Sequence, residues 1–303
     1  MSRPVTASHV FDFAEVLAGW HKISVTAGPS GDLVMLALQQ KPDYRKNGGT
    51  TSKSFVNKPN QFRIHHLHDG KWSSSDLQET LQNMSYAQPL SQSRWILVRA
   101  RSGGNTDGNG HIYAAQGNLL ETVALGDGIQ DVQTTIKGHL WVSYFDEGVF
   151  GDTSLGNSGL ACLNEDGTLA FDFNKLTQGM IADCYALNVV SDSETWLCPY
   201  TDFPIVRLRD RQIDHSWDNN PIHGSGAFAV WKDRVLFSGG YSEKNKLFIV
   251  NLYRLDSGEL LKEECHAVDE SGSEIKFTGV FGRGSRLYLA TEQSLYFLEL
   301  QEI

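Results

Sequence analysis

Residues 140–145 read LWVSYF, follow a short apolar stretch at 129–136, and lead on to LACL at 160–163 and an Asp166-Gly167 turn. The same order of apolar strand, aromatic-rich strand and third strand before a glycine turn recurs about six times along the chain. Tandem repetition of one small β unit is typical of a β-propeller, in which each blade buries its faces against neighbouring blades. The sequence therefore predicts an all-β fold.

The other copies of the repeat follow the same order. Their expected strands are Ile23–Ala27, Leu33–Leu38, Gln61–Leu67, Met84–Leu90, Arg94–Val98, His111–Ala115, Cys184–Val190, Thr195–Cys198, Ile205–Leu208, Ala227–Val230, Val235–Phe237, Leu247–Tyr253, Phe277–Phe281, Leu287–Ala290 and Ser294–Leu300. The last copy stops one strand short, and we expect His9–Phe13 to supply its outer strand, because that pairing removes an open sheet edge. We predict a single domain over residues 1–303, a six-bladed β-propeller closed by this N-terminal strand. A seventh blade would have to lie within residues 39–61, which have little strand character.

Composition narrows the classes of function. Lys and Arg number 26 against 36 Asp and Glu, so the formal net charge is 26 − 36 = −10. Nucleic acids and anionic membranes attract positively charged surfaces, so we expect neither as a partner. A cationic partner or a neutral ligand fits this charge better.

Neither the N-terminus nor the cysteines carry a recognisable sequence motif. The N-terminus lacks the apolar core of a signal peptide, and no stretch of about 18 apolar residues is present to span a membrane. The cysteines lack CxxC spacing and lie mostly in strand-like runs, so we expect reduced core residues; they are Cys162, Cys184, Cys198 and Cys265. A cytoplasmic monomer is the expectation.

Two long loops invite a functional interpretation. Residues 40–60 are basic and contain a Gly48–Ser52 tract, so we expect a mobile insertion that is either a plain surface loop or an anion-contacting lid. In the loop 102–110, the oxygen donors Asn105, Asp107 and Asn109 alternate as they do in calcium loops. The acid that would complete such a loop is Gln116 instead, which favours a glycine-rich turn.

Polar and aromatic residues recur at the ends of two aromatic strands. Tyr144, Asp146 and Glu147 follow Trp141, and Tyr200 and Asp202 follow Trp196. This recurrence is typical either of turn capping and packing within a blade or of a binding rim on one face. Strand crossovers add two residues to the same face, so the predicted binding set is Tyr144, Asp146, Glu147, Tyr185, Tyr200, Asp202 and His223.

The crossovers also carry acidic residues. Asp127, Asp131 and Asp183 are candidate ligands for a divalent cation such as calcium at the central channel, although polar residues line any water-filled channel. His66 and His68 share one face of a strand but lack the helical spacing of a zinc peptidase motif. A hairpin surface explains them better than metal ligation.

The repeat resembles six-bladed propellers of the broad class that includes gluconolactonase-like and NHL-type proteins. Residues 141–151 and 181–188 are similar to stretches in uncharacterised bacterial propeller proteins. The repeat is WD40-like in period but lacks the Gly-His and Trp-Asp marks. In lactonase-type propellers a Glu of the first blade helps to hold a central divalent cation. Here His21 and Lys22 stand near that position, and no Glu-Gly-Pro opening is present.

A fold of this kind supports many functions. We favour a non-catalytic binding or scaffold propeller with no cofactor, which engages a protein or small-molecule ligand through its long loops. The alternative is a metal-dependent hydrolase or lactonase, in which a cation held by the three aspartates activates water or polarises a carbonyl.

Overall fold

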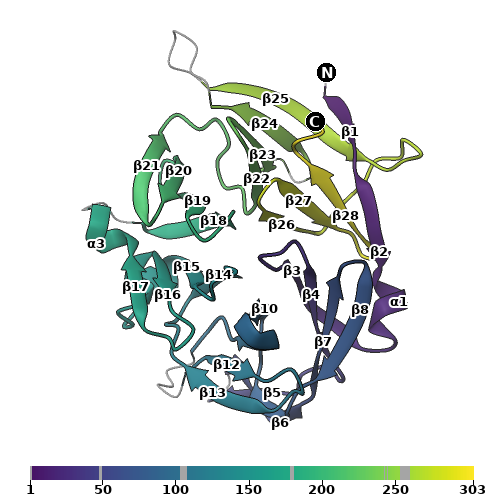
Figure 1. The fold of residues 1–303 in the computed structure, drawn as a ribbon, viewed down its shortest axis with the longest axis vertical. Helices are drawn as coiled ribbons and strands as arrows, with labels where there is room; N and C mark the ends of the chain where they lie inside the picture. Colours follow the sequence, from purple (N-terminus) through teal and green to yellow (C-terminus); the bar gives the residue numbers. More distant parts are fainter. Residues whose placement is uncertain are drawn as a thin grey trace. The chain divides into compact units, whose positions relative to one another are not determined.

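The computed structural model describes residues 2–47, 50–102, 108–177, 181–241, 243, 245–252 and 260–303, and it is dominated by β-strands (Figure 1). The described strands form seven sheets, six of which contain four or five strands. The short helices are α1 (Phe13–Leu17), α2 (Asp146–Val149) and α3 (Phe173–Thr177), with 3-10 turns at Ser91–Ser93 and Gly156–Ser158. Among the described residues, no helix has both the length and the apolar character needed to cross a membrane.

The chain divides into two compact units, Leu17–Asp183 and the combination of Met1–Val16 with Cys184–Ile303. In the first unit, one sheet contains β3 (His21–Ala27), β4 (Leu33–Leu38), β7 (Phe62–His68) and β8 (Lys71–Asp76). The next contains β10 (Tyr86–Leu90), β11 (Arg94–Val98), β12 (Gly110–Tyr113) and β13 (Leu119–Val123), and the third contains β14 (Ile129–Thr134), β15 (Leu140–Tyr144), β16 (Leu160–Leu163) and β17 (Leu169–Asp172). A smaller sheet is made by β5 (Tyr44–Asn47), β6 (Thr50–Asn60) and β9 (Thr80–Gln82).

The second unit also has three large sheets. The first contains β18 (Asp183–Val189), β19 (Glu194–Tyr200), β20 (Ile205–Arg209) and β21 (Gln212–Trp217). The second contains β22 (Phe228–Trp231), β23 (Arg234–Ser238), β24 (Leu247–Asn251), β25 (Leu261–Val268) and β1 (Arg3–Thr6). The third contains β26 (Gly279–Arg283), β27 (Arg286–Ala290), β28 (Ser294–Glu299) and β2 (Ser8–Asp12).

Within each unit the apolar core lies between sheets that follow each other in the chain. Ile96 and Leu97 are neighbours in β11 and belong to separate clusters, because successive side chains of a strand point to opposite faces. Ile96 shares its cluster with Val142 of the next sheet, and Leu97 shares its cluster with Leu36 of the preceding one. The sheet that contains β11 therefore buries its two faces against two different neighbouring sheets, which is the behaviour that the repeated sequence predicts.

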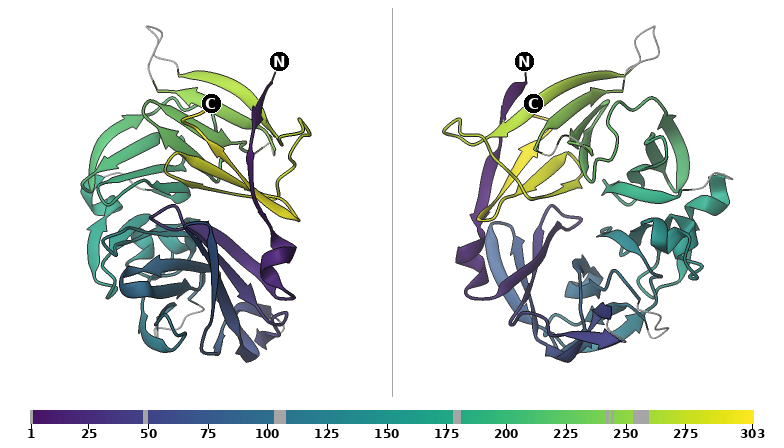
Figure 2. Two further views of the ribbon diagram at one scale, coloured as in Figure 1. Left: turned by 45° about the vertical axis from the view of Figure 1, so that its right-hand side comes forward. Right: turned by 180° about the vertical axis from the view of Figure 1, so that it is seen from behind.

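The N-terminal segment contributes to two sheets of its unit. β2 pairs antiparallel with β28, so the expected outer strand is present, with Phe11 opposite Leu295. β1, which the sequence did not predict, pairs parallel with β25, with Arg3 opposite Cys265. In Figure 2 the purple N-terminal segment runs past the edges of both sheets. The single domain and the six-bladed ring stay predictions.

The basic segment 40–60 differs from the expectation. Residues 44–47 and 50–60 form the strands β5 and β6, whereas the sequence indicated little strand character there. A short alternation of buried and more open side chains accounts for the strand β6, since Ser54 and Val56 are buried while Phe55 between them is more open. Charged residues around this short alternation obscured it in the sequence. All four cysteines are buried and none of them is in a disulfide, as expected.

Candidate functional site

The predicted binding residues of the third repeat do not form an exposed rim. Tyr144 is completely buried, and its hydroxyl donates a hydrogen bond to the Leu125 carbonyl oxygen at 2.7 Å. Burial raises the pKa of this phenol well above its ordinary value. Tyr144 is therefore a core residue, because every side chain of β15 is buried, and it is not part of an exposed rim.

Asp146 and Glu147 are exposed, as expected, and they begin the short helix α2. Glu147 forms an ion pair with Arg101, whose guanidinium also lies 3.4 Å from the Asp127 carboxylate. The Asp146 carboxylate accepts a hydrogen bond from the Glu147 amide at 2.7 Å. These acids therefore have local partners, and Arg101 neutralises part of the predicted acidic patch.

The three aspartates predicted to hold a cation have separate environments. Asp127 accepts the Ser102 amide at 2.5 Å, and Asp131 accepts the Gln133 side-chain amide at 3.0 Å. Burial, together with the nearby charge of Asp146, raises the pKa of Asp183 to about 6. Within the described ranges these three do not belong to any group of three His, Cys, Asp or Glu residues whose ligand atoms lie within 4.8 Å of one another. The geometry thus does not support the predicted calcium site.

Only part of the calcium-like loop lies within the described residues. Asn105 and Asp107 lie outside the described residues. Asn109 is buried, donates to the Arg99 and Gly126 carbonyl oxygens at 3.0 and 2.8 Å, and accepts the Leu125 amide at 2.9 Å. Its side chain is used to hold the backbone, as expected for the glycine-rich turn.

Three of the four remaining predicted residues come together. Tyr185, Tyr200, His223 and two residues that the sequence analysis missed, Phe203 and Tyr241, form what we call the aromatic cluster. Phe203 lies at its centre, with ring centroids 5.1 Å from Tyr185, 5.6 Å from Tyr200, 5.4 Å from His223 and 5.8 Å from Tyr241. Phe203 is buried, whereas Tyr200 and Tyr241 are 41% and 57% exposed. The cluster therefore presents two open rings on a packed aromatic base.

The turn after β19 positions this cluster. Asp202 is exposed at the turn, and Phe203 follows it with a φ of 53°, in the left-handed region that is uncommon for a bulky residue. The buried Asn220 side chain donates to the Phe203 carbonyl oxygen at 2.9 Å and so holds the strained residue in place. The Tyr241 hydroxyl donates to the Tyr185 hydroxyl at 2.8 Å. Strain concentrated beneath exposed rings is typical of a functional surface.

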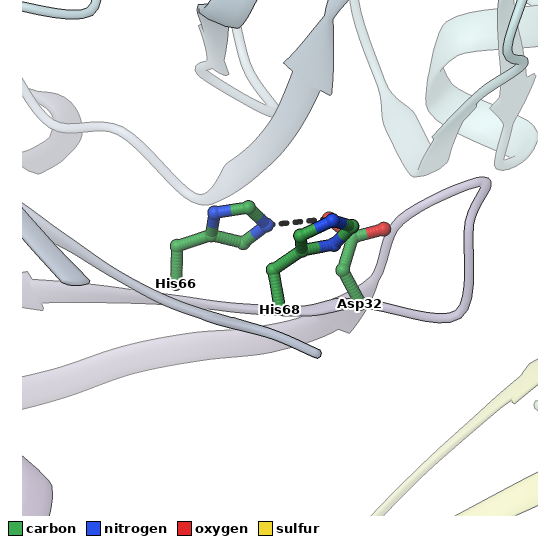
Figure 3. A group of neighbouring side chains, drawn as sticks. All are labelled: Asp32, His66 and His68. Carbon is green, nitrogen blue, oxygen red and sulfur yellow. Dashed lines mark hydrogen bonds and ion pairs between the residues drawn. The ribbon is translucent and has the colours of Figure 1, made fainter. Parts of the chain in front are cut away.

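A second group of chemically active side chains lies in the other unit. The Nε2 atom of His66 lies 2.7 Å from the Asp32 carboxylate, and the His66 and His68 rings stack with centroids 5.6 Å apart (Figure 3). Burial raises the pKa of Asp32, but hydrogen bonds from His66 and Ser30 outweigh it, so that the pKa falls below its usual value. The sequence showed that the two histidines share a face, but it gave no sign of Asp32, which lies just before the neighbouring strand β4.

Comparisons with known proteins agree with the fold. Residues 160–298 match the YxzG family, and no curated protein matches the chain in sequence. Among solved structures, a virginiamycin B lyase from Staphylococcus aureus with quinupristin aligns over 95% of this chain and 97% of its own, with 13% identity and a TM-score of 0.51. A luciferin-regenerating enzyme aligns over 96% and 94%, with 11% identity and a TM-score of 0.52.

A gluconolactonase from Xanthomonas campestris also aligns, over 97% of this chain and 95% of its own, with 11% identity and a TM-score of 0.44. At these identities the similarity concerns the fold. It supports the predicted all-β propeller fold.

Proposed function

We propose that this protein binds an organic cation, such as a quaternary amine or a basic side chain of a partner protein, on the aromatic cluster. The observation that carries the proposal is the packing of Tyr200 and Tyr241 around Phe203, with both tyrosines exposed. Aromatic faces attract cations through the ring quadrupole, and rings that are already packed lose little freedom on binding.

Charge supports this choice of ligand. Asp202 is exposed and directly precedes Phe203 in the chain, so the turn that carries the central ring also carries an acidic side chain. The formal net charge of −10 attracts cations over the wider surface. Both features favour a cationic ligand over an anionic one.

The test is a titration of the whole protein with choline and with its neutral isostere 3,3-dimethylbutan-1-ol, followed by NMR or calorimetry. We expect choline to bind more tightly than the alcohol. Tyr241→Ala and Tyr200→Ala should each weaken choline binding about two- to fivefold, which is the range for a cation–π contact at an exposed site.

A matched control is Phe150→Ala, which removes an aromatic ring that is 63% exposed and lies outside the cluster. Its choline affinity should equal that of the wild type. The proposal would be contradicted if the wild type bound choline and the neutral alcohol equally well, or if Phe150→Ala weakened choline binding as much as the tyrosine variants do. The second candidate, a hydrolase or lactonase with a cation on Asp127, Asp131 and Asp183, gains no specific observation at those residues.

A further inference from the structure

Strand register brings Asp32, His66 and His68 to one face of a sheet. In the pairing of β4 with β7, Leu33 lies opposite Leu67 and Val34 opposite His66. Asp32 lies just before β4, and extending the same register by one residue puts it opposite His68. His66 and His68 are two residues apart in β7, and residues at that spacing point to the same side. Asp32 and the two histidines, which are more than 30 positions apart in sequence, thus meet by backbone pairing alone.

The carboxylate is fixed before any ligand arrives. The Asp32 side chain is 3% exposed, and its Oδ1 atom accepts a hydrogen bond from the Ser30 hydroxyl at 2.5 Å. Gly28 lies so close that an added Cβ would be 2.5 Å from this oxygen, so the turn closes tightly around it. A carboxylate held by a neighbouring hydroxyl is the usual arrangement of a metal ligand and its supporting partner.

The donor set matches a transition metal better than a hard cation. Two imidazoles and one carboxylate offer ligand atoms that all lie within 4.8 Å of one another. Zinc binds histidine nitrogen and carboxylate oxygen at about 2.0–2.2 Å, so ligand atoms around one ion are roughly 3–4 Å apart, within reach of small side-chain rotations. Calcium and magnesium prefer oxygen ligands alone.

The surroundings leave room for another ligand. The three residues line a pocket of about 400 Å³ together with Arg94, Trp95 and other residues of the same unit. The Trp95 ring packs edge-on against His66 with centroids 5.0 Å apart, which restrains that imidazole. His68 is about half exposed, so solvent reaches the group from its side. Three protein ligands beside an open pocket are typical of a zinc ion with a free fourth position.

We propose that Asp32, His66 and His68 bind one divalent transition-metal ion of the zinc class, with a fourth coordination position open to the pocket. The direct His66–Asp32 contact then describes the metal-free form, in which a shared proton takes the place of the ion. Metal binding displaces that proton and draws His68 into the group. The proposal does not depend on ligand binding at the aromatic cluster, which lies in the other unit.

The experiment uses the full chain after removal of metals with a chelator. Calorimetric titration with zinc chloride should show one ion per chain, and titration with calcium chloride should show none at this site. His68→Ala and Asp32→Asn should each weaken zinc binding at least about tenfold, since each removes one of three ligands. The matched control is His21→Ala, which removes an exposed histidine of the same sheet and should leave zinc affinity unchanged.

A second measurement separates loss of a ligand from loss of the fold. Cobalt in place of zinc should give the visible absorption of a four-coordinate ion, and azide should shift that spectrum by entering the open position. Circular dichroism of His68→Ala should match the wild type, because this side chain is about half exposed. The assignment would be overturned if His68→Ala bound zinc as tightly as the wild type, or if the wild-type titration did not show one ion per chain. Asp32 and His66 would then form only an ion pair with each other.

Discussion

At the scale of single residues, Asp183 is a carboxyl group that folding makes harder to ionise. Burial and the charge of Asp146 raise its pKa from 3.8 to about 6. Between these values the folded protein holds a proton that the unfolded chain releases. The free energy of unfolding should therefore fall as the pH rises from about 4 to about 6.5.

Asp183→Asn removes this titration. We expect the free energy of unfolding of the variant to fall less over that pH range than that of the wild type. At pH 7 it should be about 1 kcal/mol higher than the wild-type value, after allowance for solvent screening of a partly exposed group. Urea denaturation at several pH values measures the effect. Asp152→Asn, at an exposed position, should keep the wild-type profile, and parallel profiles for Asp183→Asn and wild type would refute the assignment.

Some residue-scale expectations depend on neighbours in the chain. Tyr185 and Tyr200 belong to strands that the apolar pattern identifies, His223 lies in the segment before β22, and the three rings meet around Phe203. Ligand binding by this group stays a prediction. Tyr144 is buried because β15 is covered on both sides, whereas the sequence placed it at an exposed strand end. Asp32 was missed because its partners are brought to it by the pairing of two strands, which no local pattern reveals.

At the scale of elements, β1 protects the open side of β25. Val5 is buried, and its segment runs parallel to residues 265–268. Val5→Asp should destabilise the protein by roughly 2–4 kcal/mol, because an unpaired charge would enter an apolar site. In this variant, the backbone amides of β25 should exchange their hydrogens faster than those of β23.

Arg3→Ala provides the control for this element. The side chains of Arg3 and Glu263, which form an ion pair, are both exposed, so losing this pair should lower the free energy of unfolding by less than about 1 kcal/mol. If exchange in β25 were equally fast in the wild type and in Val5→Asp, β1 would not be a stable part of the sheet.

Element boundaries show which strands the sequence defines well. The bounds of β4, β11 and β16 agree with the predicted ones, because each is a continuous apolar run with turn residues on either side. β1 and β6 escaped prediction because polar and charged residues interrupt their alternation, and the partner strand rather than the sequence decides their pairing.

At the scale of the whole molecule, core clusters link each sheet to the next within a unit. Leu36 and Leu236 are completely buried, one in each unit. If the sheets form the predicted closed propeller, Leu36→Ala and Leu236→Ala should each lower the midpoint of one shared unfolding transition, by about 2–5 kcal/mol.

The measurement compares far-ultraviolet circular dichroism with tryptophan fluorescence during denaturation. Coincident curves in both variants would support a single cooperative domain. Two separated transitions, with each variant shifting a different one, would show that the units unfold independently. The repeat in the sequence predicted the type of sheet and its packing; it could not specify how the units are joined, because that depends on contacts far apart in the chain.

The attachment of β2 to β28 has a consequence for synthesis on the ribosome. Phe11 leaves the exit tunnel 295 − 11 = 284 residues ahead of its partner Leu295. The earlier segment must therefore wait, unpaired and available to chaperones or to other nascent chains, until the intervening chain has been made. Slowing translation should lengthen that wait and increase aggregation, rather than help this protein to fold.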